Sequence, residues 1–419
     1  MEETKLFNRV YDDIKRRRQR ILDGQINCIP CTFKRFSEEW PGIEQQKMYG
    51  VTGQQKAGKT QLTDKMFLYD PFFYVFNNRD KIRLKIKYFS LEISAEEKYK
   101  QFLCHLLYIL SKGTIRVSQR DLNSTIASSP LSQQIIDIMG SEQYVEYYKF
   151  FEESVEIISH IRNPTGIHAH LKKYAKENGT WSYKEIDWTE EDGSISKRSV
   201  KDYYIPNDPD EYVILIIDHI SLISTESEGG KMMNLHESIS KLTSKYLIDL
   251  RDEFRYIPVI VQQQALSGEG IENIKLGKLK PSVSDLGDNK LTSRDVNIFF
   301  GIFSPIRHNL HDYLGYSIDK FEDNIRFMEI MVSREGGNGS TSPLYFDGCT
   351  NYFRELPLPN DSIGIAKVYS MLDSIRQPKK VAMFLFRNDE LKEKRRNYVK
   401  NFVLSTEWFR KNLKFWKNT

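Results

Sequence analysis

The residues whose spacing most directly indicates chemistry are Gly53-Gln-Gln-Lys-Ala-Gly58-Lys59-Thr60. They match the pattern GxxxxGK[ST], in which backbone N–H groups of a glycine-rich turn surround phosphate oxygens. In such a loop the lysine contacts the β- and γ-phosphates, and the threonine hydroxyl binds Mg²⁺. We therefore predict a nucleoside triphosphate site with ATP and Mg²⁺ as cofactors. Its predicted binding residues are Gly53, Gln54, Gln55, Lys56, Ala57, Gly58, Lys59, Thr60 and Gln61.

Two acidic residues end apolar runs that are typical of buried strands. Asp218 ends the run from Tyr212, and Glu92 follows the run from Leu84. Since the carboxyl ends of parallel strands meet at one edge of a sheet, both carboxylates are expected beside the phosphate loop. There Asp218 would share Mg²⁺ with Thr60, and Glu92 would polarise a water for in-line attack on the γ-phosphate. Two simpler interpretations stay open: a turn-capping aspartate, and an acid near a helix N-terminus.

Short apolar runs alternate with stretches of helical periodicity along most of the chain. Strands are expected at 47–52, 84–91, 212–218, 257–263, 296–303, 326–333 and around 344–346. The clearest helical patterns cover 97–111 and 234–254. Strands separated by helices imply a mostly parallel sheet that is covered on both faces. The predicted fold class is therefore α/β, a P-loop NTPase core with a mostly parallel twisted sheet flanked by helices.

A series of short motifs resembles the DnaB-type replicative helicases, in the order that this family has. Besides the phosphate loop, the motifs begin at Ile29 (IPCTF), Phe89 (FSLEISAEE), Ile216 (IIDHISLI), Pro258 (PVIVQQQ), Lys280 (KPSVSDL) and Arg334 (REGGNG). The Asp-His pair at 218–219 looks closest to the phage T7-type members. The resemblance implies a RecA-like ATPase core, encoded by a phage, that acts as a ring-shaped helicase.

The resemblance also implies a role for single residues. Glu92 matches the catalytic glutamate, and Gln264 matches the glutamine that senses the γ-phosphate and couples it to the DNA-binding loops. Arg334 matches the arginine finger that enters a neighbouring subunit's site, so that hydrolysis depends on an oligomer. With Lys59, these are the predicted catalytic residues. The chain departs from the family at Val332, where the family has a lysine, and a surface arginine is the simpler interpretation of Arg334.

The resemblance to RecA-like motors implies that the loops after the third and fourth strands face the central channel and the DNA. They cover 224–233 and 265–289. The second contains Lys275, Lys278 and Lys280 among glycines, and spaced lysines can follow the phosphates of a single strand. The window has a small net charge, so a solvated loop without a ligand is the alternative.

Charge is distributed unevenly over the 419 residues. Residues 376–419 carry 13 Lys and Arg against 4 Asp and Glu, whereas residues 185–211 carry 3 bases against 9 acids. We divide the chain into an amphipathic linker helix (1–24), a RecA-like domain (25–358) with an acidic β-rich insertion at about 176–210, and a basic helical extension (359–419). The helix either packs on its own core or reaches a neighbouring subunit. The extension either binds DNA or docks on the insertion, which the apolar residues within it favour.

These observations predict an ATP-dependent replicative DNA helicase that translocates on single-stranded DNA as a homo-oligomer, a hexameric ring. A recombinase-type filament ATPase is the first alternative, and a small-molecule P-loop kinase is the second. Expected partners are DNA and, for replication, a primase, polymerase or loader. Four cysteines and no apolar run of membrane-spanning length argue against a disulfide framework and a membrane protein, and predict a cytoplasmic location, in a host cell if a phage encodes the chain.

Overall fold

The computed structural model describes residues 5–265, 279–336 and 339–376. Contacts divide the chain into one unit from Met1 to Leu356 and a second from Pro357 to Thr419. The second unit contains helix α14 (Ser362–Arg376). All other described elements belong to the first unit, in which none of the described helices has both the length and the apolar composition needed to cross a membrane.

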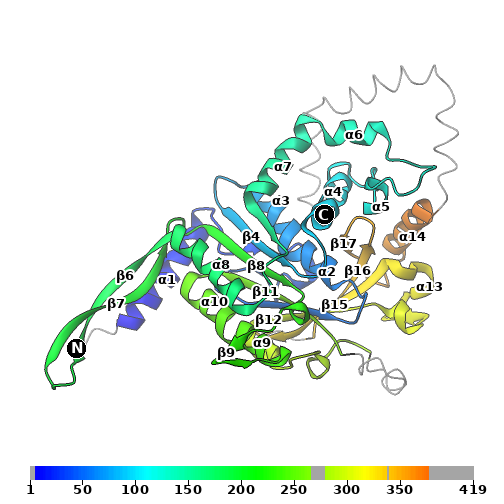
Figure 1. Cartoon of the computed structure of the whole chain (residues 1–419). Coiled ribbons are helices and arrows are strands. Elements are labelled where there is room, and N and C mark those ends of the chain that lie inside the picture. The colour runs from blue at the N-terminus through cyan, green and yellow to red at the C-terminus, as the bar shows by residue number, and fades with distance from the viewer. Residues whose placement is uncertain (1–4, 266–278, 337–338, 377–419) are drawn as a thin grey trace. The chain divides into compact units, whose positions relative to one another are not determined.

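A mixed sheet forms the centre of the first unit (Figure 1). Six neighbouring strands are parallel, in the order β12 (Ile298–Phe303), β3 (Tyr49–Gly53), β11 (Ile257–Gln263), β8 (Glu211–Asp218), β4 (Arg83–Ser90) and β5 (Val155–Ile158). Three antiparallel strands extend the sheet beyond β12, in the order β15 (Ile325–Ser333), β16 (Thr341–Asp347) and β17 (Tyr352–Glu355). The mostly parallel α/β fold predicted from the sequence is confirmed.

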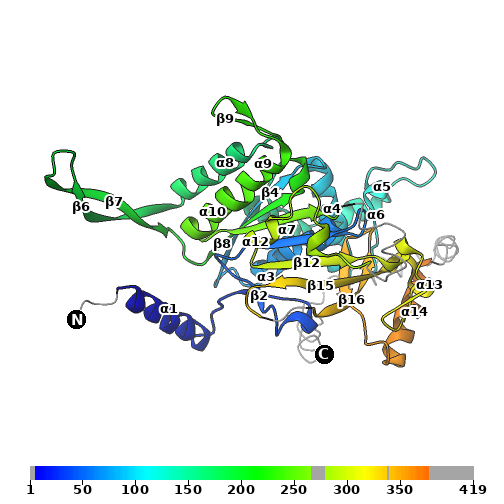
Figure 2. The same cartoon turned by 90° about the horizontal axis from the view of Figure 1, so that it is seen from below.

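Helices cover both faces of the sheet (Figures 1 and 2). One face packs against the phosphate-loop helix, α4 (Ala95–Leu110) and α7 (Glu142–Ser154). The other face packs against α8 (Pro164–Glu177) and the helical stretch formed by α9 (Leu235–Lys241), η4 (Leu242–Leu247) and α10 (Ile248–Phe254). Alternate side chains of a central strand point to opposite faces, so a strand covered on both faces must be apolar along its interior, as β8 is from Tyr212 to Ile217.

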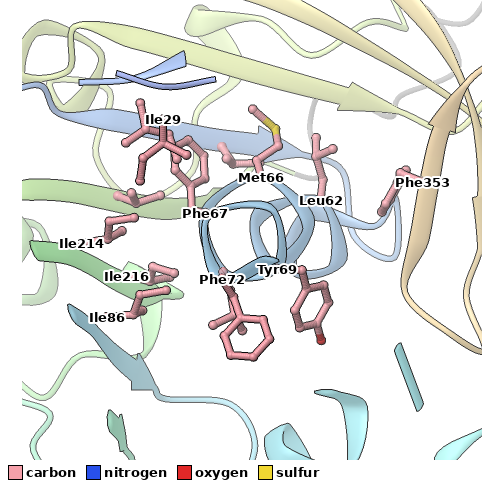
Figure 3. Close-up of a cluster of buried hydrophobic side chains, with 14 of the residues drawn as sticks. Ile29, Leu62, Met66, Phe67, Tyr69, Phe72, Ile86, Ile214, Ile216 and Phe353 are labelled. Atoms are coloured by element: carbon pink, nitrogen blue, oxygen red, sulfur yellow. The ribbon is translucent and has the colours of Figure 1, made fainter. Parts of the chain in front are cut away.

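The helix after the phosphate loop runs through α2 (Lys59–Thr63), the π-helical turn η2 (Asp64–Tyr69) and α3 (Asp70–Phe76). Figure 3 shows apolar side chains on several sides of it: Leu62, Met66, Phe67, Tyr69 and Phe72 are all buried. Isoleucines of β4 and β8 complete this cluster. The helix is therefore fixed within the core, and its N-terminus is held at the end of β3.

The sequence did not predict the region between β4 and β8 completely. It contains the short helices α5 (Gln119–Leu122) and α6 (Gln133–Met139), then α7, and the edge strand β5. β5 has four residues, Val-Glu-Ile-Ile, with a half-buried acid among them. Such a short run does not show the alternation that distinguishes a strand from part of a helix.

The acidic segment forms a two-stranded antiparallel hairpin, β6 (Gly179–Thr189) and β7 (Ile195–Pro206), which extends away from the sheet (Figures 1 and 2). Trp181 and Tyr204 at its base pack against Phe254 of α10, with ring centroids 5.8 and 5.0 Å from the Phe254 ring. Most of its other residues are exposed or half-buried. The base thus belongs to the core, whereas the outer part does not.

Helix α1 (Lys5–Leu22) is held by ion pairs rather than by apolar packing. Arg17 pairs with Glu44 at 2.6 Å, and Arg20 pairs with Asp210 at 2.6 Å. The predicted apolar stripe of the helix, formed by Phe7, Val10, Ile14 and Ile21, is exposed in the single chain, and Tyr11 is exposed as well. The structure therefore does not support the first interpretation of this helix, in which the stripe packs on the core of its own chain. The division of the chain into domains stays a prediction.

The hairpin provides a test of this description. Tyr204→Ala removes a buried ring and a hydroxyl that donates to the carbonyl of Ala175 at 2.8 Å, so we expect it to lower the free energy of unfolding by about 3 kcal/mol. Tyr183→Ala, at an exposed position of the same hairpin, is the control and should change it by less than about 0.5 kcal/mol. Urea denaturation measures both. Equal effects of the two substitutions would contradict a core limited to the hairpin base.

Candidate functional site

The phosphate loop connects the end of β3 to the start of α2, and two glycines are needed for its course. A Cβ atom at Gly53 would lie 2.5 Å from the backbone oxygen of Ile302 on the neighbouring strand β12. Gly58 has φ = +102°, a left-handed conformation that residues with a Cβ rarely adopt. The N-terminus of the helix at Lys59 therefore faces the loop, where unpaired backbone N–H groups favour an anion.

The loop side chains make defined contacts. The ammonium of Lys59 donates to the backbone oxygen of Gln54 at 2.9 Å, so it lies over the loop. The side chain of Gln54 is buried and donates to the backbone oxygen of Leu279, and its amide oxygen pairs with Nε2 of His308 at 2.5 Å. Gln55 and Lys56 are exposed, whereas Ala57 is buried.

The structure brings Thr60 and Asp218 together. The hydroxyl of Thr60 donates to Oδ1 of Asp218 at 3.1 Å, although the two residues are 158 positions apart. Among the described residues, no three His, Cys, Asp or Glu side chains form a metal-binding group. Magnesium is commonly bound by one or two protein oxygens together with phosphate oxygens and waters, so one hydroxyl and one carboxylate at a phosphate loop fit this ion. Thr60 and Asp218 are the residues that would hold it.

Glu92 lies at the same edge of the sheet as Asp218. In the parallel register Ser90 is opposite Asp218, and the N–H of Leu91 donates to the backbone oxygen of Asp218 at 2.8 Å. The Glu92 side chain is exposed. The N-terminus of α4 is capped by Ser94, whose hydroxyl accepts from the N–H of Glu97 at 3.2 Å. The carboxylate of Glu92 therefore precedes the cap, next to the strand end.

The imidazole of His219 lies near the charged groups of Asp218, Glu92 and Lys59. Burial lowers the pKa of its imidazole, while the carboxylates of Asp218 and Glu92 act to raise it and the ammonium of Lys59 to lower it further. All three charges act on this one imidazole. The phosphate loop, Asp218 and Glu92 thus lie around the carboxyl ends of β3, β4 and β8.

Gln264 lies between the phosphate-loop strand and a part of the second predicted DNA loop, 265–289. Its N–H donates to the backbone oxygen of Gly53 at 3.1 Å, and its side-chain amide donates to Oγ1 of Thr52 at 3.0 Å. Its amide oxygen accepts from the N–H of Ser282 at 3.3 Å. A buried side chain with these contacts connects the end of β3 directly with Ser282 of that predicted loop.

Arg334 lies far from its own phosphate loop. Its backbone N–H donates to the backbone oxygen of Asn297 at 3.0 Å. The backbone N–H of Asn297 in turn donates to the backbone oxygen of Met48 at 2.7 Å. Met48 precedes β3, whereas the phosphate loop follows it, so that the whole length of β3 separates the two. The exposed guanidinium donates to the backbone oxygen of Arg294. Arg334 is the one predicted catalytic residue that the structure does not bring to the site of its own chain.

The predicted DNA contacts are described only in part. Lys275 and Lys278 lie outside the described residues. Lys280 is exposed and forms an ion pair with Glu329 at 3.3 Å. In the first loop Glu226 accepts from Thr165 at 2.7 Å and pairs with Lys241 at 2.9 Å, which ties the start of the loop to α8 and α9.

Sequence reasoning missed Arg326, which supports the phosphate loop from β15. Its side chain is almost fully buried, and Nε donates to the backbone oxygen of Ala57 at 2.7 Å. The same guanidinium donates to the backbone oxygens of Asp323 and Ile325 and to the Asp323 carboxylate. Burial lowers the pKa of Arg326, and Asp323 acts to raise it. An arginine inside the apolar run Ile-Arg-Phe-Met was the signal available in the sequence.

Sequence reasoning also missed a buried polar network behind Asp218. Tyr88 donates to Oδ2 of Asp218 at 2.8 Å and also lies 2.9 Å from Oδ1 of Asp64. Lys98 donates to both carboxylate oxygens of Asp64, at 3.2 and 3.0 Å, and to the Tyr88 hydroxyl at 2.9 Å. Burial and the two carboxylates raise the pKa of Tyr88, which keeps it a hydrogen donor. Burial raises the pKa of Asp64, and Lys98 opposes that rise.

Known proteins share this architecture at low sequence identity. No protein-family model matches the chain, and no curated protein matches it in sequence. One solved structure, described as an ATPase domain, is similar with a TM-score of 0.55 and 15% identity, over 84% of this chain and 98% of that chain. A DnaB-like replicative helicase, described with its interactions with primase, gives a TM-score of 0.53 and 15% identity over 84% of this chain and 68% of that chain. The chain has a RecA-like fold.

This finding confirms the fold class expected from the sequence, a RecA-like P-loop core with a mostly parallel sheet. At this identity the likeness concerns the fold alone. The phosphate loop follows β3, Asp218 ends β8 and Glu92 follows β4, so all of them lie at one edge of the sheet. This is the edge at which ligands bind in open α/β sheets.

The role of Arg326 can be tested by stability. Arg326→Met leaves three backbone oxygens and the Asp323 carboxylate without this donor, and we expect it to lower the free energy of unfolding by about 3 kcal/mol. Arg354→Met replaces an exposed arginine of the edge strand β17 and should change the free energy of unfolding by less than about 1 kcal/mol. Denaturant unfolding of the two variants is the measurement. No difference between them would show that Arg326 does not support the loop.

Proposed function

We propose that the chain is an ATP-dependent DNA helicase that hydrolyses ATP at the interfaces of a ring and translocates on single-stranded DNA. The observation that carries the proposal is the contact between the phosphate-loop hydroxyl of Thr60 and the carboxylate of Asp218, with Glu92 at the adjoining strand end. This set contains a phosphate cradle, two oxygen ligands for Mg²⁺ and a base for water. The resemblance of the motifs and the shared fold support the choice of a helicase among P-loop NTPases.

Each residue has a task in the proposed hydrolysis. Lys59 moves from the Gln54 carbonyl to the β- and γ-phosphate oxygens, while the loop N–H groups hold the phosphates in place. Thr60 and Asp218 would hold Mg²⁺, and a bound cation would supply positive charge that offsets the charge of the phosphates. Glu92 orients a water and accepts its proton as the water oxygen attacks the γ-phosphorus. The bond from that phosphorus to the bridging oxygen breaks, and ADP and inorganic phosphate leave.

Two features link this hydrolysis to an oligomer and to DNA. Arg334 is at the opposite end of β3 from its own phosphate loop, so the site it serves as a finger is that of a neighbouring subunit. Gln264 contacts Thr52 and Ser282, so a shift at the γ-phosphate would reach the second predicted DNA loop at Ser282. A closed hexamer, with primase, polymerase or loader as replication partners, completes the proposal.

A forked DNA duplex tests the central activity. The wild-type chain with ATP and Mg²⁺ should separate the strands, and Lys59→Ala should lower the unwinding rate at least 100-fold because an essential phosphate contact is lost, on the order of 3 kcal/mol in the transition state. Lys173→Ala removes an exposed lysine of α8 and should unwind like the wild type.

The other outcomes of that assay identify the alternatives. Strand exchange without unwinding would replace the helicase by a recombinase-type filament ATPase. Phosphate transfer to a nucleoside or metabolite, with ATPase activity that DNA does not stimulate, would replace it by a kinase.

Mixing two inactive variants tests the arginine finger. Arg334→Ala keeps an intact site but lacks the finger, and Glu92→Gln keeps the finger but lacks the base, so each alone should show little ATPase activity. In a random mixture about a quarter of the interfaces join an intact site to an intact finger, and activity should return to about that fraction of the wild-type value. If Arg334 acted within its own chain, the mixture would stay as inactive as its components.

A further inference from the structure

The residues that contact Asp218 from inside the core form a polar network in a place where apolar side chains would pack equally well. Asp64, Tyr88 and Lys98 are fully buried, and their elements meet in the layer between the sheet and the helices. A buried ion pair adds little stability compared with apolar side chains of similar size, because both charges lose their hydration. The network therefore calls for an explanation other than stability, and its one contact at the candidate functional site is Asp218.

The hydrogen bonds of the network can all be satisfied in only one way. Tyr88 has a single hydroxyl hydrogen, and its oxygen accepts from Lys98. Lys98 already donates to both oxygens of Asp64, so Asp64 does not need the tyrosine hydrogen. That hydrogen then goes to Oδ2 of Asp218, which leaves Oδ1 on the side of Thr60. The Asp218 carboxylate is thereby held in one orientation.

The charges of the network lead to a second effect. Nζ of Lys98 lies 3.0 Å from Oδ2 of Asp64 but 4.0 Å from Oδ2 of Asp218. Lys98 thus forms its ion pair with Asp64, and the negative charge of Asp218 is not neutralised by Lys98. Asp218 can therefore attract a divalent cation. Without Asp64 the ammonium would be one small movement away from pairing with Asp218.

The network also involves the helix that follows Glu92 in the chain. Lys98 belongs to α4, whose cap Ser94 lies two residues after Glu92. Asp64 belongs to the phosphate-loop helix, four residues after Thr60. The three residues therefore connect α4, which follows Glu92, with the phosphate-loop helix. Through Tyr88 they also contact Asp218 at the end of β8.

We propose that Asp64, Tyr88 and Lys98 are positioning residues that orient the carboxylate of Asp218 toward a nucleotide-bound divalent cation and keep the charge of Lys98 away from it. The inference rests on the proposed nucleotide site and assigns residues that determine how strongly this site depends on Mg²⁺. All three side chains are fully buried, so they are assigned a role that acts through Asp218.

Binding of a fluorescent ATP analogue, titrated with Mg²⁺, tests the proposal in the full-length chain. Tyr88→Phe removes only the oxygen that orients Asp218, and we expect the Mg²⁺ concentration for half-maximal binding to rise about tenfold, as for other residues that orient metal ligands. Affinity for the analogue in the presence of a chelator should not change. Tyr49→Phe is the matched control, because it deletes a buried tyrosine hydroxyl of β3 that contacts the backbone at Gly42 and Glu44.

A second pair of variants separates positioning from simple stability. Asp64→Asn should also raise the Mg²⁺ midpoint, because Lys98 then pairs with Asp218 and competes with the cation. Adding Lys98→Met to Asp64→Asn should lower the midpoint again, whereas damage to packing would grow with each substitution. Thermal unfolding of each variant shows that it is folded.

The outcomes are distinct for the two proposals. A wild-type chain that binds no analogue at any Mg²⁺ concentration would overturn the proposed function. A wild-type chain that binds, with Tyr88→Phe and Tyr49→Phe at the same midpoint or with no reversal by Lys98→Met, would overturn the positioning role and leave the nucleotide site intact.

Discussion

The contact between the Thr60 hydroxyl and the Asp218 carboxylate is the constraint around which the rest of the molecule is arranged. It requires β3 and β8 to end at the same level, although β11 lies between them. Parallel register achieves this, because Val259 of β11 pairs with Tyr49 of β3 on one side and with Ile216 of β8 on the other. Parallel strands in turn need crossover helices, and these helices need apolar faces on both sides of the sheet.

The packing around the phosphate-loop helix serves the same constraint. A helix that shifted by one residue would move its N-terminus by about 1.5 Å, enough to separate Thr60 from Asp218. Phe67 and Phe72 lock the helix from different sides, and the guanidinium of Arg326 holds the loop at Ala57. The site is therefore built on elements whose positions the core determines, rather than on a free loop.

Features that a linear pattern determines could be predicted from the sequence. The glycines, Lys59 and Thr60 form a contiguous motif, and the apolar runs of β8 and β11 are those that only a doubly covered strand tolerates. Asp64 and Lys98 could not be found in this way, because each looks like an ordinary polar residue of a helix until folding places them 3.0 Å apart. Arg334 shows a third limit: the sequence suggests a finger, but its distance from its own loop depends on the antiparallel return of β15.

The strand β15 connects two places that would act in different subunits of the proposed ring. Near its start Arg326 holds the phosphate loop of its own chain, and directly after its end stands Arg334. These residues are eight positions apart, about 27 Å along an extended strand. Strand β12 pairs with β15 from Phe327 to Ser333, with one irregularity, and β16 pairs with it from Ile325 to Glu329. In the proposed ring a displacement of the loop at one end would be carried along this paired backbone to the other. Consecutive sites of the ring would then be joined end to end by single strands, and the order in which they fire would be a property of the sheet itself.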